Sequence, residues 1–363
     1  MDNFNSWSIE YSPPKITEAT LKREFSFLSE SISYALQQKR IDFDATKNQF
    51  FSSTRKVKLG RMKFKCKGTA KDSFRIPGQA LNRNKGVKLD NQTLNLPKMD
   101  PIKMIVDRRF NGEVRSVTVS RNKSDQYLVS VLVKDDIKLK LQTKRSVGID
   151  LGLAHLAILS NGMKIDNPKW FRESQSKLRK YQKHFSRKFK GSKRREKARL
   201  EVARIYQKIT NQRDWYLHNI TSWLVENYDI ISIENLNIKG MLKNKKLSKS
   251  SSDASWAKFI SMLEYKCNWY GKTLVKIDRW FPSSKTCSSC GTKIELLPLN
   301  VREWECVCGA VHDRDVNAAN NILTEGLKEL YNITSAELVD YRHGEKLSLL
   351  TKLHSNIAFS VKC

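Results

Sequence analysis

The sequence contains no run of 18 or more apolar residues, and no charged segment followed by an apolar one begins at Met1. A membrane-spanning helix needs about 20 consecutive apolar residues, and an export signal needs a charged and then apolar N-terminal stretch. We therefore expect a cytoplasmic protein that has no membrane partner.

Negative charge is scarce. Only 37 Asp and Glu accompany 67 Lys and Arg, which gives a formal net charge of +30 in 363 residues. A surface this basic repels itself strongly unless a polyanion lies against it. The composition favours nucleic acid as the partner over a small-molecule substrate, and the length allows two or three domains with a sizeable core.

Cysteine is also sparse, but it is unevenly placed. Four of the seven cysteines lie close together, whereas Cys66, Cys267 and Cys363 are scattered. In a chain without an export signal such clustering favours a metal site over disulfides. The clustered residues are Cys287, Cys290, Cys306 and Cys308.

These four cysteines form the pattern CSSC, fifteen residues, then CVC. Gly291 and Gly309 each follow one pair and suit a tight turn that directs backbone amides at sulfur. The second pair is CxC instead of the commoner CxxC, so His312 is an alternative fourth ligand, although four thiolates are favoured. A closed site of this kind holds a structural zinc ion and does not catalyse a reaction.

The N-terminal part, residues 1–140, mixes helical and strand patterns. Apolar residues at helical spacing predict a helix over Thr20 to Arg40. Residues 103–134 contain the segments KMIVDRRF, EVRSVTVSR and QYLVSVLVK, which predict an antiparallel β unit. Between them, residues 53–83 are basic and suit phosphate binding, with a solvated loop as the alternative. The candidate contacts there are Arg55, Lys56, Lys58, Arg61, Lys63 and Lys65.

A second region opens at residue 146 with SVGIDLG and continues with strand, helix and strand patterns, which indicates an α/β layered domain. Residues 173–210 read as one long helix with 14 Lys and Arg against 3 acidic residues, followed by a helix over Trp215 to Asn227. A surface that binds a nucleic-acid backbone explains this charge better than a solvated helix does. The candidate contacts are Arg179, Lys180, Arg187, Lys188, Lys193, Arg194 and Arg195.

Three acidic residues stand at the edges of predicted elements in this domain. Asp150 lies in an apolar strand, Glu234 ends the strand IISIE, and Asp315 opens a helix. A buried unpaired carboxylate is costly, so each is either paired structurally or compensated by a cation; Asp315 could also be a helix N-cap, with Asp313 as its rival. Together the three would form an oxygen-rich site for Mg²⁺ or Mn²⁺ that cleaves phosphodiesters.

The segments GIDLGL, IENL, DRWFPSSKTCSSCG and VREWECVCGAVHDRDVNAANNI strongly resemble TnpB, the transposon-encoded RNA-guided endonuclease related to type V CRISPR effectors. The resemblance covers about residues 146–330, and more weakly SFRIP, LNLPKM and the stretch from SISYALQQ to NQFF. By this resemblance Asp150, Glu234 and Asp315 match the catalytic acids of the RuvC domain, and the four clustered cysteines match the zinc ligands.

The resemblance implies an α/β RNase H-like (RuvC) nuclease domain with an inserted zinc ribbon, and an N-terminal mixed β-barrel and helical nucleic-acid-binding domain. It assigns the nuclease domain to residues 146–280 and 312–331 and the ribbon to 281–311. The tail, residues 332–363, shows little periodicity and no chemical motif, so we expect it to be peripheral or disordered. The stretch before SISYALQQ reads as abbreviated relative to the family.

The function implied is a transposon-associated RNA-guided DNA endonuclease that uses structural Zn²⁺ and catalytic Mg²⁺ or Mn²⁺. Its partners are a guide RNA from the transposable element and a target DNA. The alternatives are a guide-directed repressor that does not cut DNA and a DNA-binding accessory of transposition.

Overall fold

The computed structural model describes residues 17–331, except 53–71, 79, 81–87, 91, 108–109, 111, 238–239, 241–253 and 299. The chain divides into two compact units, Met1–Asp136 and Ile137–Cys363. Among the described residues, no helix is long and apolar enough to cross a membrane. The basic residues predicted between 55 and 65, the first 16 residues and the tail after residue 331 lie outside this part of the chain.

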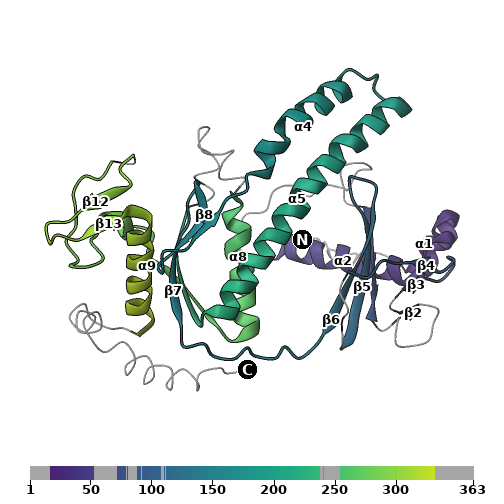
Figure 1. Ribbon diagram of the computed structural model, residues 1–363. Coiled ribbons are helices and arrows are strands. Elements are labelled where there is room, and N and C mark those ends of the chain that lie inside the picture. The colour runs from purple at the N-terminus through teal and green to yellow at the C-terminus, as the bar shows by residue number, and fades with distance from the viewer. Residues whose placement is uncertain are drawn as a thin grey trace, which may run out of the picture. The chain divides into compact units, whose positions relative to one another are not determined.

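The first unit combines short helices with two antiparallel sheets (Figure 1). Its helices are α1 (Glu18–Glu24), the 3-10 helix η1 (Ser26–Glu30) and α2 (Ser33–Phe51). One sheet has the order β1-β5-β6, with β1 at Asp72–Pro77, β5 at Glu113–Arg121 and β6 at Tyr127–Lys134. The other has the order β2-β3-β4, with β2 at Lys88–Leu89, β3 at Thr93–Asn95 and β4 at Ile102–Lys103. Closure of these strands into a barrel stays a prediction.

Two local predictions for this unit were wrong. The helix expected over Thr20 to Arg40 is interrupted around Phe25 and Ile32, in a serine-rich stretch whose hydroxyls compete with helical hydrogen bonds. The segment KMIVDRRF contributes only its first residue, Lys103, to the short strand β4, and β5 pairs instead with β1. Strand β1 comes from the basic segment taken for a phosphate-binding surface, yet its Ile76 is fully buried.

The second unit is built on a five-stranded mixed sheet of order β11-β10-β7-β8-β9. Strand β7 (Ser146–Asp150) lies in the middle, parallel to β10 (Ile230–Glu234) and antiparallel to β8 (His155–Leu159). The edges are β11 (Thr273–Ile277), parallel to β10, and β9 (Lys164–Asp166), antiparallel to β8. This arrangement confirms the predicted α/β layered domain.

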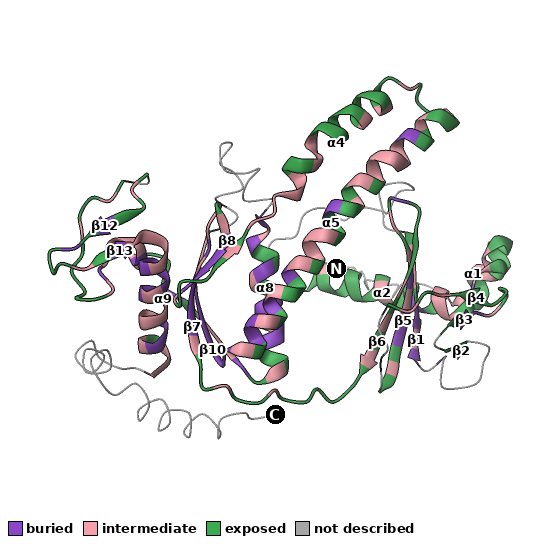
Figure 2. Cartoon of the chain, viewed as in Figure 1, coloured by how far each residue is buried: buried purple, intermediate pink, exposed green. Residues whose placement is uncertain are grey.

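Helices cover the two faces of this sheet differently (Figures 1 and 2). On one face, large side chains such as Ile149 and Ile231 form a core with α5 (Lys193–Asn227) and α8 (Trp256–Tyr270). On the other face the alternate strand positions are small, with Gly148 in β7 and Ser232 in β10. Helix α9 (Arg314–Tyr331) packs there at backbone distance, because a Cβ on Gly148 would lie 2.0 Å from the carbonyl oxygen of Ala319.

The basic helical region is a hairpin, which corrects the predicted boundaries. Helix α4 (Trp170–Ser186) ends before residues 187–192, and α5 then runs without interruption to Asn227. Gly191, with φ of +85°, allows the reversal, and the Ser192 hydroxyl caps α5 by accepting the N–H of Arg195. The predicted single helix over 173–210 was therefore wrong at its centre, whereas its predicted continuation over Trp215 to Asn227 is confirmed as the end of α5.

Replacing Gly148 with alanine should destabilise the second unit, because the added methyl group would push α9 away from β7. We expect a loss of about 3 kcal/mol from overpacking, against about 1 kcal/mol for the control Gly191→Ala, whose only cost is the left-handed backbone. Urea unfolding followed by tryptophan fluorescence reports this unit, since every tryptophan except Trp7 lies in it. Equal losses in the two variants would show that α9 is not closely packed at Gly148.

Candidate functional site

Asp150 and Glu234 end adjacent parallel strands. Ile149 of β7 pairs with Ile233 of β10, so the two carboxylates that follow leave the sheet side by side. Burial, together with the negative charges of Glu234 and Asp315, raises the pKa of Asp150 from 3.8 to about 7. These effects outweigh the Leu151 N–H and the nearby Arg314, which act in the opposite direction. The structure thus brings Glu234 and Asp315 within electrostatic reach of Asp150.

Asp315 lies in the first turn of α9, but it is not the N-cap. The neighbouring Asp313 has that role, because its carboxylate accepts the backbone N–H groups of Asp315 at 3.0 Å and Val316 at 3.1 Å. Asp313 also binds the ammonium group of Lys164 at 2.6 Å. Although burial opposes the effect, these hydrogen bonds hold the pKa of Asp313 below its usual value. Asp313 is therefore the N-cap of α9. The Asp315 carboxylate does not cap the helix and can have another role.

Two polar residues that sequence reasoning missed contact the acids. The Ser283 hydroxyl donates to Oε1 of Glu234 at 2.5 Å, and Arg302 Nη1 lies 3.3 Å from Oδ2 of Asp315. Both residues belong to residues 283–313, which we call the cysteine segment. The sequence shows only that polar groups flank the cysteines, and it does not show that Ser283 is buried. The acids therefore have partners from outside the sheet.

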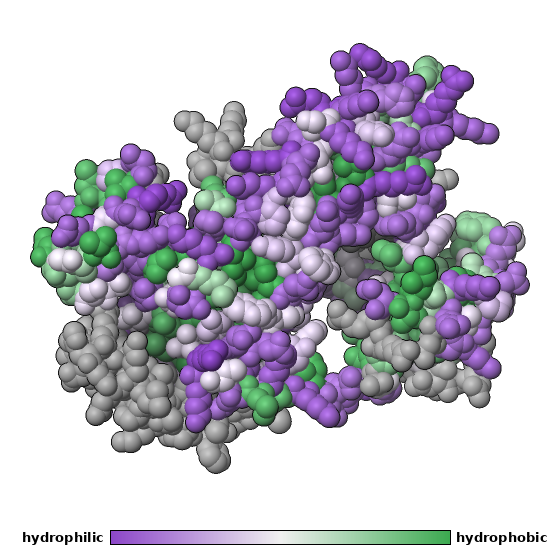
Figure 3. All heavy atoms as spheres, in the orientation of Figure 1, coloured by the Kyte–Doolittle hydropathy of each residue, from purple (hydrophilic) through white to green (hydrophobic). Residues whose placement is uncertain are grey.

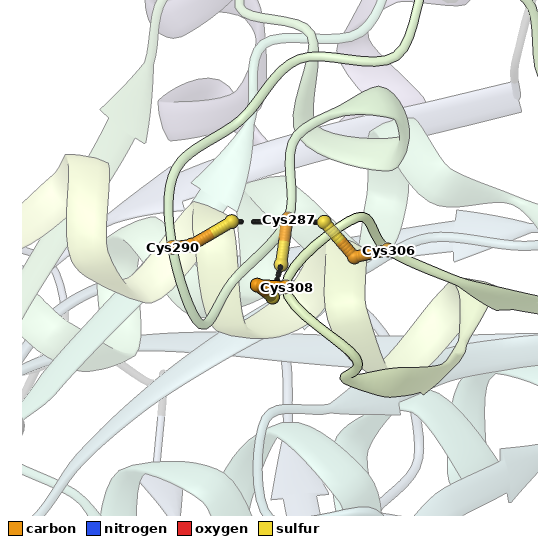
Figure 4. Close-up of side chains that lie close together, drawn as sticks. All are labelled: Cys287, Cys290, Cys306 and Cys308. Carbon is orange, nitrogen blue, oxygen red and sulfur yellow. Dashed lines mark hydrogen bonds between the residues drawn. The ribbon is translucent and has the colours of Figure 1, made fainter.

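The four clustered cysteines converge in the structure (Figure 4). Their sulfur atoms all lie within 4.8 Å of one another, with Cys287 Sγ 3.8 Å from Cys308 Sγ and Cys290 Sγ 3.6 Å from Cys306 Sγ. Gly291 and Gly309 both have φ of +80°, which confirms the tight turns predicted after each pair. In the described part of the chain, no other group of three or more Cys, His, Asp or Glu side chains is this compact, and the three acids are more widely spaced.

Two thiols of this cluster have pKa values shifted in opposite directions. Hydrogen bonding to Thr292 lowers the pKa of Cys290 to about 6. The N–H of Cys308 acts to lower the pKa of Cys306, but burial and the neighbouring thiols together outweigh it and raise that pKa to about 12. A bound cation would remove this conflict by stabilising all four thiolates together. The cluster therefore has the chemistry of a metal site.

His312, the alternative ligand, lies beside the cluster on β13 (Val311–Asp313), which pairs with β12 (Glu303–Glu305). Its Nε2 lies 3.0 Å from Cys287 Sγ, and its ring packs against Trp304 at 4.8 Å between centroids. Burial lowers the pKa of His312, which favours the neutral ring. The geometry suits a hydrogen bond to a thiolate, in addition to four sulfur ligands.

The predicted basic contacts that are described lie on the α4–α5 hairpin, where Figure 3 shows a largely hydrophilic surface. Arg195 is already engaged, because Nη1 donates to the carbonyls of Phe185 and Lys188 at 3.3 and 2.7 Å. Lys188 is half-buried. The remaining side chains are exposed, namely Arg179, Lys180, Arg187, Lys193 and Arg194.

Two known families match separate parts of this chain. Residues 128–245 match the family described as "Probable transposase", and residues 256–322 match "Cas12f1-like, TNB domain". The second match spans α8, β11, the cysteine segment and the start of α9. The fold and these matches define the class as TnpB- and Cas12-like proteins.

Two relatives that match along most of their length identify the family within this class. The chain is 43% identical over 319 residues to a "Putative RNA-guided DNA endonuclease" of Streptomyces pristinaespiralis, covering 87% of this chain and 77% of the relative. It is 30% identical over 340 residues to InsQ of Escherichia coli (strain K12), which has the same description, covering 88% and 79%. The chain belongs to the TnpB family.

Among solved structures, the chain is similar to Cas12f1 in a complex with sgRNA and target DNA, with 17% identity and a TM-score of 0.43. A CRISPR-Cas12f ternary complex gives 17% identity and a TM-score of 0.37. The matches cover 58% and 59% of this chain, and the chain spans less than half the length of each of those proteins.

In buffer free of Mg²⁺ and Mn²⁺, Asp150→Asn should stabilise the protein at pH 8. The raised pKa means that protonated Asp150 favours the folded state, so stability from this group is full near pH 4 and is lost as pH rises through about 7. Asparagine avoids that loss. We expect a gain on the order of 2 kcal/mol at pH 8 that shrinks as pH falls and approaches zero near pH 4, measured by urea unfolding. A variant that is less stable than the wild type at pH 8 would contradict the assigned environment.

Proposed function

We propose that the protein is a transposon-associated RNA-guided DNA endonuclease that cuts phosphodiesters at Asp150, Glu234 and Asp315. The observation that carries this proposal is the convergence of three carboxylates on one sheet edge and helix end in a member of the TnpB family. Two relatives that match along most of their length are named as RNA-guided DNA endonucleases. The net charge of +30 suits simultaneous binding of RNA and DNA.

The three acids fit a site for Mg²⁺ or Mn²⁺. Carboxylate oxygens are the ligands these ions prefer, and Asp150 is partly buried beside two like charges that a cation would neutralise. Bound divalent ions supply activation of a water nucleophile and stabilisation of the leaving oxygen. Ser283 would hold the Glu234 carboxylate in one orientation through its hydroxyl. Arg302 lies close enough to balance charge at Asp315.

We further propose that the cysteine segment is a zinc ribbon inserted into an RNase H-like (RuvC) domain. A tetrahedral zinc with bonds of about 2.3 Å needs sulfur atoms about 3.8 Å apart, and the closest pairs here are 3.6 and 3.8 Å apart. The proposed layout keeps residues 146–280 and 312–331 for the nuclease domain, 281–311 for the ribbon and 1–140 for binding RNA and DNA. The sheet order around the central strand β7 supports the RuvC assignment.

Guided cleavage should require all three acids. The protein would be co-expressed with its flanking element DNA, its nuclease-protected RNA sequenced, and cleavage of a matching plasmid followed with Mg²⁺. We expect Asp150→Asn, Glu234→Gln and Asp315→Asn each to slow cutting by roughly a hundredfold or more, since even outer partners of a metal site are worth 10–100-fold. Asp278→Asn is the matched control, because Asp278 follows the edge strand β11 and accepts the N–H of Trp280.

The same experiment separates the alternatives. Element-derived RNA with acid-dependent cutting supports the endonuclease. Bound RNA and guide-directed DNA binding without cutting would make the protein a repressor. If the protein neither retains RNA nor cuts the matching plasmid, a DNA-binding accessory of transposition is the remaining alternative.

Zinc content tests the ribbon. Purified protein should contain one zinc per chain, and Cys308→Ser should lose it, because an exposed ligand is removed without creating a cavity. His312→Gln should keep one zinc, since His312 contacts a sulfur ligand but lies outside the four-thiolate set. Elemental analysis after dialysis measures both. Loss of zinc in His312→Gln with retention in Cys308→Ser would instead make His312 the fourth ligand.

The hairpin tip should contribute to nucleic-acid affinity through its exposed arginines. Replacing Arg187 and Arg194 together with glutamine should weaken binding of a guide RNA–DNA duplex and lower the slope of log affinity against log salt by about 2, one for each phosphate contact. Arg199→Gln is the control on the same helix, because Arg199 is paired with Glu196 at 2.7 Å. Fluorescence anisotropy across a salt series measures the slope, and an unchanged slope in the double variant would remove the tip from the interface.

A further inference from the structure

Two buried asparagines on α9 attach the cysteine segment to the helix. Asn317 accepts the N–H of Ser288 and donates to the carbonyl of Thr286, both at 2.8 Å. Asn321, one turn further along, donates to the carbonyls of Ser283 at 2.8 Å and Thr286 at 2.6 Å. Both asparagines are at most 3% exposed. The four hydrogen bonds therefore fix the chain on either side of Cys287 to one face of α9.

The same connection reaches two of the proposed catalytic acids. The Ser283 carbonyl is held by Asn321, while the hydroxyl of that serine donates to Glu234. At the N-terminal end of α9 stands Asp315, which lies near Arg302 from the far side of the cysteine segment. A displacement of the segment along α9 would thus move the partner of Glu234 and the partner of Asp315 together.

We propose that Asn317 and Asn321 are positioning residues that couple metal binding by the four cysteines to metal binding by the three acids. This inference rests on the proposed function of both sites. The thiolate cluster sets the shape of the turn containing Cys287, and the asparagines transmit that shape to Ser283 and α9. The Thr286 carbonyl accepts from both amides, but among the described residues only Asn317 is seen to bind the Ser288 N–H and only Asn321 the Ser283 carbonyl. An apolar residue at either position would leave one of these buried groups without its partner.

Coupling of this kind is reciprocal. If the ordered cysteine segment improves the affinity of the acids for Mg²⁺, bound Mg²⁺ must equally stabilise the segment with its zinc. A purely structural role for the asparagines predicts lower stability without any link between the two metals. The two possibilities therefore differ in a measurable way that does not depend on catalysis.

The first test compares Asn321→Ala with Asn320→Ala in the full-length, zinc-loaded protein. Asn320 lies on the same helix, is partly exposed and makes no side-chain hydrogen bond to a described residue, so the control has the same change in helix propensity. The Mg²⁺ concentration that gives half of the thermal stabilisation is measured for each. We expect it to rise about tenfold in Asn321→Ala and not in Asn320→Ala, with one zinc per chain in both. Equal Mg²⁺ dependence in the two variants would overturn the proposal.

The second test uses the wild type and decides the matter even if Asn321→Ala loses zinc or fails to fold. Zinc affinity is measured by equilibrium competition with a chromogenic chelator, with and without a Mg²⁺ concentration that saturates the thermal shift. Coupling predicts about fivefold tighter zinc binding with Mg²⁺, and no change in Asp150→Asn, which lacks a Mg²⁺ ligand. Zinc affinity that is independent of Mg²⁺ in the wild type would refute the coupling.

Neither test involves a guide or a target. Failure of guided cleavage with coupling intact would remove the proposed function and leave the connection between the sites. Acid-dependent cleavage without coupling would support the proposed function and remove the connection between the sites.

Discussion

The close approach of α9 to the central strand is the contact on which the candidate site depends. It is possible because Gly148 and Ser232 present almost no side chain to that face, and Gly326 of the helix lies directly against Ser232. A bulkier sheet position would hold α9 farther away and separate Asp315 from Asp150. The same contact explains why two strands and a helix, taken from three distant parts of the chain, can place carboxylates near one another.

That convergence has an electrostatic cost which the protein only partly offsets. Asp150 is partly buried among like charges, and its raised pKa expresses this cost. Ser283 binds Glu234, and Arg302 lies beside Asp315. The neighbouring Asp313 already caps α9 and binds Lys164. A cation-binding site is the state in which such a cluster is fully compensated. The arrangement is thus costly as a set of structural ion pairs and suitable as a metal site.

The cysteine segment contributes groups to the carboxylate site in addition to holding the four-cysteine cluster. It would be an independent module if it contacted α9 only through apolar side chains. Instead, Asn317 and Asn321 bind its backbone by directional hydrogen bonds that tolerate little displacement. The proposed coupling between the two metals follows from this rigidity.

Much of the candidate site could be predicted from the sequence, because its signals are local. An acid inside or directly after an apolar strand, and cysteines in two close pairs, mark their chemistry wherever the chain folds, and the TnpB family was identified from such segments. The α/β layering and the turns at Gly291 and Gly309 were predicted for the same reason. Element boundaries were less secure: the reversal at Gly191 was missed, since basic residues continue the helical pattern on both sides of it.

Only the tertiary structure decided which of Asp313 and Asp315 caps α9, that β1 and not KMIVDRRF pairs with β5, and that Ser283, Arg302, Asn317 and Asn321 belong to the site. The Asp313 cap uses N–H groups two and three residues away, but either aspartate fits a cap by its sequence. Each of the other features depends on a partner far away in sequence, and spacing along the chain carries no information about such partners. The sequence by itself determined the types of chemistry that the protein contains. Packing of α9 on the small face of the sheet determined which of those groups meet, because contact at backbone distance leaves room for only one arrangement.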